Sequence, residues 1–230
     1  MYAIKDVEYF KLAHRLNEDF KHILLKENVH FRGSLNSLSM ISTSNEKPEL
    51  GVKCNANYKS TGDIENFIYE DIRKIKAKQF PKRNTPEKEL QAWIINNALN
   101  DNEKKLAFDK DIKFITSELA IFNSHGEKIV TDILGYSVND NQLCIIELKS
   151  SRLMKELIQQ VNNFEKVIKE KFDFFSELLS FQKFSFQKEL SKEVKKIIVW
   201  PYARTSPKKE LKGANIIEVT YQERYTFTKF

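Results

Sequence analysis

The first third of the chain changes from a helical to an extended hydrophobic pattern and back. Apolar residues at helical spacing predict an amphipathic helix over residues 4–26. A stretch rich in Ser, Asn and Thr over residues 29–60 predicts two strands around a polar turn. Helical spacing returns from Gly62 to Gln79, where basic residues near the end suit a helix C-terminus. This region is therefore expected to be helix-rich.

A short basic loop between two X-Pro steps separates this region from the remainder. Phe80-Pro81 and Thr85-Pro86 bracket it, and residues before proline are disfavoured in helices. We place a domain boundary here, with an N-terminal region at residues 1–83 and a second domain at 84–230. The first helix of the second domain is expected to begin at Pro86, with Thr85 as its N-cap.

Beyond that helix, extended segments dominate the pattern. Three of them are separated by His-Gly-Glu and Asn-Asp-Asn, which are turn-prone and join antiparallel strands. A long helix, a shorter helix and two further strands are expected after them. The three extended segments cover residues 111–122, 128–138 and 142–151, the long helix covers about 153–179, and the last strands cover 195–203 and 214–221.

Composition fits a globular protein. The chain has 230 residues, 41% hydrophobic and 30% charged, with a mean hydropathy of −0.51. Its longest apolar runs are a few residues, far short of the roughly 20 that cross a bilayer, so a membrane protein is not expected. The N-terminus lacks the apolar core of a secretory signal, which favours the cytoplasm. Cys54 and Cys144 stand in no metal-binding or disulfide pattern and are expected to be reduced thiols.

Charge is distributed unevenly along the chain. The formal net charge is +6, with +4 over residues 1–83, −3 over 84–152 and +5 over 153–230. An acidic middle between basic flanks suits a carboxylate metal centre inside a surface that attracts phosphates. Uneven surface charge without function is the alternative reading.

The acidic middle contains the residues with candidate chemistry. Glu147 and Lys149 lie two residues apart at the end of an apolar strand, so both side chains leave one face while Leu148 points into the core. Asp132 lies on the preceding strand. Two carboxylates on adjacent strands form a hard oxygen site suited to Mg²⁺ or Mn²⁺. A nearby lysine then holds the attacking water and offsets phosphate charge.

These residues resemble the signature of the PD-(D/E)XK nuclease superfamily. Asp132 followed by Glu147-x-Lys149 matches it, although Thr131 stands where some members have proline. In many members the first helix supplies a glutamate within E-x-x-L-Q, and here Glu87 matches, with Glu89 as the second choice. The resemblance implies an α/β, restriction-endonuclease-like core of one helix, a three-strand meander, a helix and a strand.

The most similar branches are the RecB-like nucleases and the endonucleases acting on branched or mismatched DNA. They carry a glutamine and then an aromatic residue four positions later on the next helix, where Gln160 and Phe164 stand. The family usually has tyrosine there, so the role of Phe164 is open. The resemblance covers about residues 85–202.

The resemblance implies a Mg²⁺-dependent deoxyribonuclease. Asp132, Glu147 and the carbonyl of Leu148 would bind the metal, Lys149 would position water, Glu87 would assist the metal, and Gln160 would orient Lys149 or a phosphate. DNA is the expected partner. A symmetric homodimer and a larger restriction, defence or repair assembly are further expectations, and residues 1–83 are assigned to DNA recognition or dimerisation.

Other interpretations of these residues stay open. Glu-x-Lys alone is commonly a surface ion pair worth under about 1 kcal/mol. A nucleic-acid-binding or assembly module that keeps the fold without catalysis is the main alternative function. No phosphate-binding Gly-rich loop or serine-hydrolase motif occurs, so nucleotide-binding and serine-hydrolase classes lack support.

Overall fold

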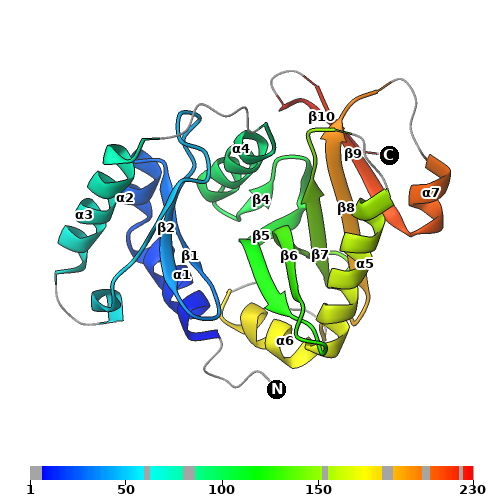
Figure 1. Ribbon diagram of the computed structural model, residues 1–230, viewed down its shortest axis with the longest axis horizontal. Helices are drawn as coiled ribbons and strands as arrows, with labels where there is room; N and C mark the ends of the chain where they lie inside the picture. The colour runs from blue at the N-terminus through cyan, green and yellow to red at the C-terminus, as the bar shows by residue number, and fades with distance from the viewer. Residues whose placement is uncertain are drawn as a thin grey trace. The chain divides into compact units, whose positions relative to one another are not determined.

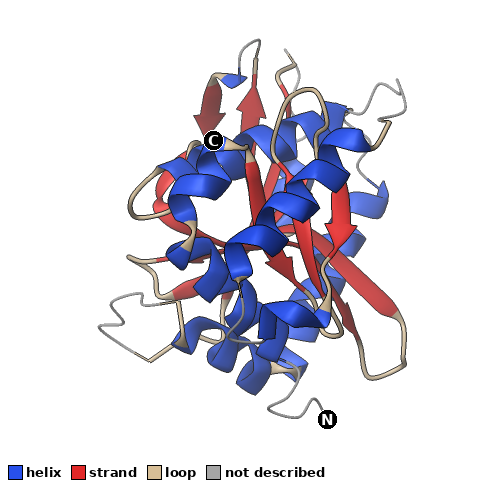
Figure 2. Cartoon of the chain, turned by 90° about the vertical axis from the view of Figure 1, so that its left-hand side faces the viewer, coloured by secondary structure: helices blue, strands red, loops and turns tan. Residues whose placement is uncertain are grey.

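The computed structural model shows a mixed α/β protein whose described residues are 7–59, 63–79, 86–151, 155–182, 189–203, 208–222 and 225–229. These residues contain seven α-helices. Helices and strands both occur throughout the described residues (Figure 2). By backbone contacts the chain divides into two compact units, Met1–Asn100 and Asp101–Phe230.

The first unit contains a small antiparallel sheet and four α-helices. Its strands are ordered β1-β2-β3. In chain order the elements are α1 (Glu8–Asp19), α2 (Lys21–Lys26), β1 (Val29–Gly33), β2 (Leu38–Ser42), β3 (Gly51–Lys53), the 3-10 helix η2 (Ala56–Lys59), α3 (Ile64–Ala77) and α4 (Pro86–Asn100).

One hydrophobic core joins this sheet to α1, α2 and α3. Leu16, Phe31 and Met40 are among its fully buried members. Tyr58 of η2 and Ile68 of α3 belong to the same core. Burial of these side chains stabilises the unit by roughly 1.5–3 kcal/mol per large apolar residue.

The elements of this unit differ from the expectations in two places. The helix over 4–26 is broken at Phe20, where the backbone leaves helical geometry so that α1 and α2 both bury apolar residues. The first expected strand is a hairpin, because Ser34 and Ser37 form a turn in which their hydroxyls are 2.9 Å apart. The sheet therefore has three strands instead of two. Residues 80–85, including the expected N-cap Thr85, lie outside the described residues.

The second unit is built on a seven-stranded mixed sheet in the order β10-β9-β8-β7-β6-β5-β4. Its strands are β4 (Lys105–Leu106), β5 (Asp109–Phe122), β6 (Lys128–Ser137), β7 (Gln142–Leu148), β8 (Val194–Pro201), β9 (Ile216–Tyr221) and β10 (Phe227–Lys229). Its helices are α5 (Lys155–Glu170), α6 (Phe172–Ser180) and α7 (Lys208–Gly213).

Strand pairing changes twice along this sheet, from antiparallel to parallel at β7–β8 and back to antiparallel at β9–β10. Strands β4 to β7 pair antiparallel in sequence, which confirms the expected meander, whereas β8 pairs parallel to β7 and β9 parallel to β8. Parallel neighbours need a crossover, and α5 and α6 provide it between β7 and β8. Helix α5 contacts β6, β7 and β8 (Figure 1). The centre of the sheet is therefore covered and apolar, with Ile145, Ile146 and Ile197 fully buried.

Two expectations for this unit need correction. The long helix over 153–179 is two helices, because the backbone at Lys171 turns out of helical geometry and lets α6 bury its own apolar residues, among them Phe175 and Leu178. The segment between the last two expected strands is rich in basic residues and is expected from its sequence to be a loop, but it contains α7. Arg204 lies outside the described residues, as do the side chains of Lys208 and Lys209.

The division between units falls after Asn100, so α4 groups with the first unit. The boundary at 83/84 stays a prediction. No helix formed by the described residues combines the length and the apolar character needed to cross a membrane.

Candidate active site

The candidate site lies where β6 and β7 separate. The last paired residues of this ladder are Ile133 and Ile146. Two residues beyond Ile146, the backbone N–H of Leu148 donates to Oδ2 of Asp132, at 2.7 Å, instead of to a β6 carbonyl. The Asp132 carboxylate therefore occupies the place of the next ladder partner and is fixed against β7.

Glu147 is the buried centre of the site. Its side chain is 0% exposed, on a central strand that helix α5 contacts. Oε2 accepts a hydrogen bond from Nε2 of Gln160, at 2.9 Å, and lies 3.7 Å from Nζ of Lys149. Oε1 is buried without a hydrogen-bond partner among the described residues. A buried carboxylate oxygen left in this way is costly unless a cation or donor meets it.

Lys149 follows directly after β7 and is held by its backbone. Its N–H donates to the carbonyl of Val199 on β8, at 2.9 Å. The hydroxyl of Tyr221 on β9 donates to the carbonyl of Lys149, at 3.4 Å. The side chain is 23% exposed, so the ammonium reaches from the buried Glu147 carboxylate toward solvent.

Burial and nearby charges raise the pKa values of both carboxylates. Burial raises the pKa of Glu147 well above its usual value, and the Asp132 charge raises it further while Lys149 lowers it. Burial also raises the pKa of Asp132, which the Leu148 N–H and Lys149 partly offset. Two close carboxylates with raised pKa values bind a proton or a cation more readily than two exposed ones.

Sequence reasoning missed one acidic neighbour of this pair, Glu118 on β5. Ser117 pairs with Ile133 and Leu119 pairs with Thr131, which puts Glu118 opposite Asp132. The Glu118 charge contributes to the raised pKa of Asp132, after burial as the main cause. The alternation of side chains along the two strands that the expected His-Gly-Glu turn joins is the sequence signal that could have identified Glu118.

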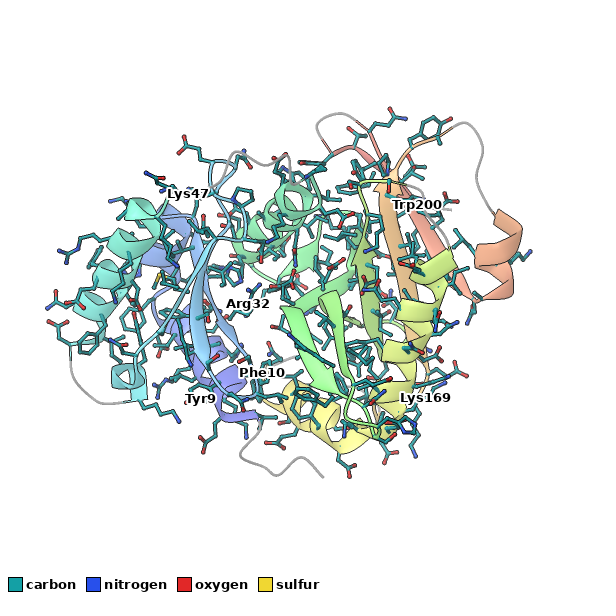
Figure 3. The ribbon with its side chains drawn as sticks, in the orientation of Figure 1. Tyr9, Phe10, Arg32, Lys47, Lys169 and Trp200 are labelled. Carbon is teal, nitrogen blue, oxygen red and sulfur yellow. The ribbon has the colours of Figure 1, made fainter. Side chains whose placement is uncertain are left out.

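Trp200 lies on β8 (Figure 3). By register Glu147 pairs with Ile198, so Trp200 stands beside the position of Lys149. It is fully buried, and its Nε1 donates to Oε1 of Glu218 on β9, at 2.9 Å. This hydrogen bond between β8 and β9 fixes the Trp200 indole.

The structure thus brings together Asp132, Glu147, Leu148, Lys149 and Gln160. Glu87 and Glu89 lie in the first turn of α4, which belongs to the other unit, so their role stays a prediction. Phe164 is a core residue of α5, fully buried and edge-to-face with Phe175, with ring centroids 6.2 Å apart.

The donors of the site suit a hard divalent cation. Asp132 and the unpartnered Oε1 of Glu147 are carboxylate oxygens. The N–H and C=O of a strand residue point to one edge, so the Leu148 carbonyl lies on the edge where its N–H meets Asp132. Within the described ranges no group of three His, Cys, Asp or Glu side chains is arranged to hold a metal ion. A metal here would depend on two carboxylates, a carbonyl and water.

No protein-family model and no curated protein matches the chain. One similar solved structure is described as "Structure of EndoMS-dsDNA2 complex", with 15% identity and a TM-score of 0.40. The match covers 85% of this chain and 66% of that chain.

Proposed function

We propose that the protein is a metal-dependent DNA endonuclease of the PD-(D/E)XK superfamily, with a restriction-endonuclease-like core. The observation that carries this proposal is the environment of Glu147. One of its oxygens meets the Lys149 ammonium and the Gln160 amide, and the other is buried without a partner among the described residues. A structural ion pair would satisfy both oxygens.

The metal-binding residues of the proposal are Asp132, Glu147 and the backbone carbonyl of Leu148. Mg²⁺ is the expected ion and Mn²⁺ its substitute, because both prefer hard oxygen ligands and keep several waters. When bound, such an ion lowers the pKa of a bound water and polarises a phosphoryl oxygen. The raised pKa values of both carboxylates support the need for a cation.

In the proposal, Lys149 positions the attacking water and stabilises the phosphate charge. Its ammonium is partly exposed, so it can reach both a buried carboxylate and a bound substrate. A positioned ammonium donates hydrogen bonds to the water and stabilises the charge that develops on phosphate oxygens. Gln160 holds the Glu147 carboxylate through Oε2, which leaves Oε1 directed to other ligands.

DNA is the proposed substrate because the carboxylate centre lies between basic parts of the chain. The segments on either side carry net charges of +4 and +5, which favour a polyanion. Restriction, defence or DNA repair is the proposed setting. Homodimerisation would supply two such sites for two strands.

The test is cleavage by the purified full chain. Supercoiled plasmid, single-stranded DNA, and branched and mismatched duplexes are incubated with Mg²⁺, with Mn²⁺ or with EDTA. The matched variants are Glu147→Ala, Lys149→Ala and Glu156→Ala, the last of which removes an exposed glutamate in the first turn of α5.

We expect metal-dependent cleavage by the wild type and by Glu156→Ala, and a loss of at least about 100-fold in the other two variants. Salt-sensitive DNA binding without cleavage by any of them would favour the non-catalytic binding module. Equal cleavage by all four proteins would point to a contaminating nuclease and contradict the assignment.

A further inference from the structure

We propose that Glu118 is a third carboxylate of the metal site and holds the bound ion through one of its waters. The inference rests on the proposed function and adds to it a residue on a different strand.

The sheet register places Glu118 beside the site. The pairs Ser117–Ile133 and Leu119–Thr131 on either side align Glu118 with Asp132. In an antiparallel pair, opposed residues leave the sheet on one face with Cβ atoms about 4.5–5.5 Å apart. Continuing the β6–β7 register by one residue also aligns Asp132 with Glu147. The three carboxylates therefore come from three consecutive strands in one row.

The backbone at Glu118 is unusual for a residue inside a strand. Its φ is +49°, in the left-handed region, within the 14-residue strand β5. Residues other than glycine rarely adopt this conformation, and its cost is commonly found at functional sites. Ser117 and Leu119, on either side of it, stay paired with β6, so Glu118 keeps its position opposite Asp132.

The Glu118 carboxylate is half-buried, and no described residue donates a hydrogen bond to it or forms an ion pair with it. Its charge still acts on Asp132, whose pKa is raised first by burial and also by Glu118. A partly buried acid beside a second acid favours a cation, which offsets the repulsion between the two negative charges.

An independent observation supports a cation beside these carboxylates. Oε1 of Glu147 is fully buried and lacks a hydrogen-bond partner among the described residues. The described carboxylates do not form a group of three that could ligate one ion directly. Mg²⁺ and Mn²⁺ keep several waters, so the third carboxylate accepts hydrogen bonds from a metal-bound water.

The test is Mn²⁺ binding to the full chain by isothermal titration calorimetry, without DNA. The proteins are the wild type, Asp132→Asn, Glu118→Gln and Glu127→Gln. Glu127 is an exposed glutamate in the turn of the same hairpin and serves as the matched control. A second variant, Glu118→Asn, removes the charge with a residue that tolerates positive φ. Circular dichroism verifies that each variant is folded.

We expect Asp132→Asn to abolish Mn²⁺ binding and both Glu118 variants to weaken it about 10-fold, with Glu127→Gln equal to the wild type. Wild-type affinity in both Glu118 variants, together with loss in Asp132→Asn, would overturn the role of Glu118 and leave the proposed function intact. Unchanged binding by Asp132→Asn, or no binding by the wild type, would overturn the metal site itself and Glu118 with it.

Discussion

Nε2 of Gln160 lies 2.9 Å from Oε2 of Glu147 and donates a hydrogen bond to it. The contact joins the crossover helix α5 to the end of β7, two elements that also pack against each other. The same oxygen lies 3.7 Å from Nζ of Lys149. Gln160 and Lys149 thus both act on Oε2, so the rotamer of Glu147 is fixed and Oε1 is left for another ligand.

The first prediction concerns this hydrogen bond. Gln160→Ala frees the Glu147 side chain to rotate, so we expect the cleavage rate and the Mn²⁺ affinity to fall about 10- to 100-fold. The KM for DNA stays close to that of the wild type. Gln159→Ala, at the exposed neighbouring position, is the control. Equal losses in both variants would indicate damage to α5 and not a loss of positioning.

Much of the site could be predicted because strand alternation is local. Glu147 and Lys149 are two residues apart, and their ion pair confirms that they leave the same face while Leu148 is buried. Asp132 follows from the turn between the two strands, which fixes their register within a few residues. Gln160 came from the resemblance, because no local pattern relates a helix residue to a residue of the strand before it.

The features that the sequence did not predict depend on long-range packing or on the backbone conformation of single residues. Glu118 faces Asp132 only through the β5–β6 register and a left-handed conformation that no propensity favours for glutamate. The break at Lys171 depends on where α6 buries its phenylalanines. The turn at Ser34 to Ser37 has Leu-Asn at its centre instead of the Asn-Gly pair that most strongly marks a two-residue hairpin loop.

The second prediction separates Lys149 from the metal ligands. Lys149→Met keeps the length of the side chain and removes its charge, so we expect the cleavage rate to fall about 10²- to 10³-fold. Mn²⁺ affinity is retained, because an ammonium repels the cation and does not ligate it. Calorimetry and single-turnover cleavage measure the two effects. Lys212→Met, at an exposed position, is the matched control, and a loss of Mn²⁺ binding by Lys149→Met would contradict the assigned role.

The third prediction follows from the raised pKa of Glu147. Because the folded state holds this proton more tightly than the unfolded state, its contribution to stability is complete below pH 4.5, the usual pKa, and is lost as pH rises through the folded value. Without metal, Glu147→Gln should therefore stabilise the protein above neutral pH by roughly 1–4 kcal/mol and flatten this pH dependence. Urea unfolding of both proteins from pH 5 to 9 measures it. Parallel pH profiles would show that Glu147 is not the titrating group.

The fourth prediction concerns metal removal. A ligand that binds only the folded state stabilises it by about 2.7 kcal/mol at 100 times its dissociation constant. Mg²⁺ or Mn²⁺ should raise the melting temperature of the wild type, and excess EDTA should reverse the change. Asp132→Asn should show no such increase. An equal increase in that variant would place the stabilising ion at another site.

The fifth prediction is that one substitution at Glu118 raises the stability of the protein and lowers its metal affinity and cleavage rate. Glycine adopts positive φ without the clash that a side chain causes, so Glu118→Gly should relieve strain at φ +49° and stabilise the protein by about 1 kcal/mol. The same change removes the carboxylate, so Mn²⁺ affinity and cleavage should fall together. Leu119→Gly, at the adjacent buried position of β5, is the control and should destabilise instead. Denaturant unfolding and calorimetry on the three proteins decide the matter, because a destabilised Glu118→Gly would show that the left-handed backbone is not strained.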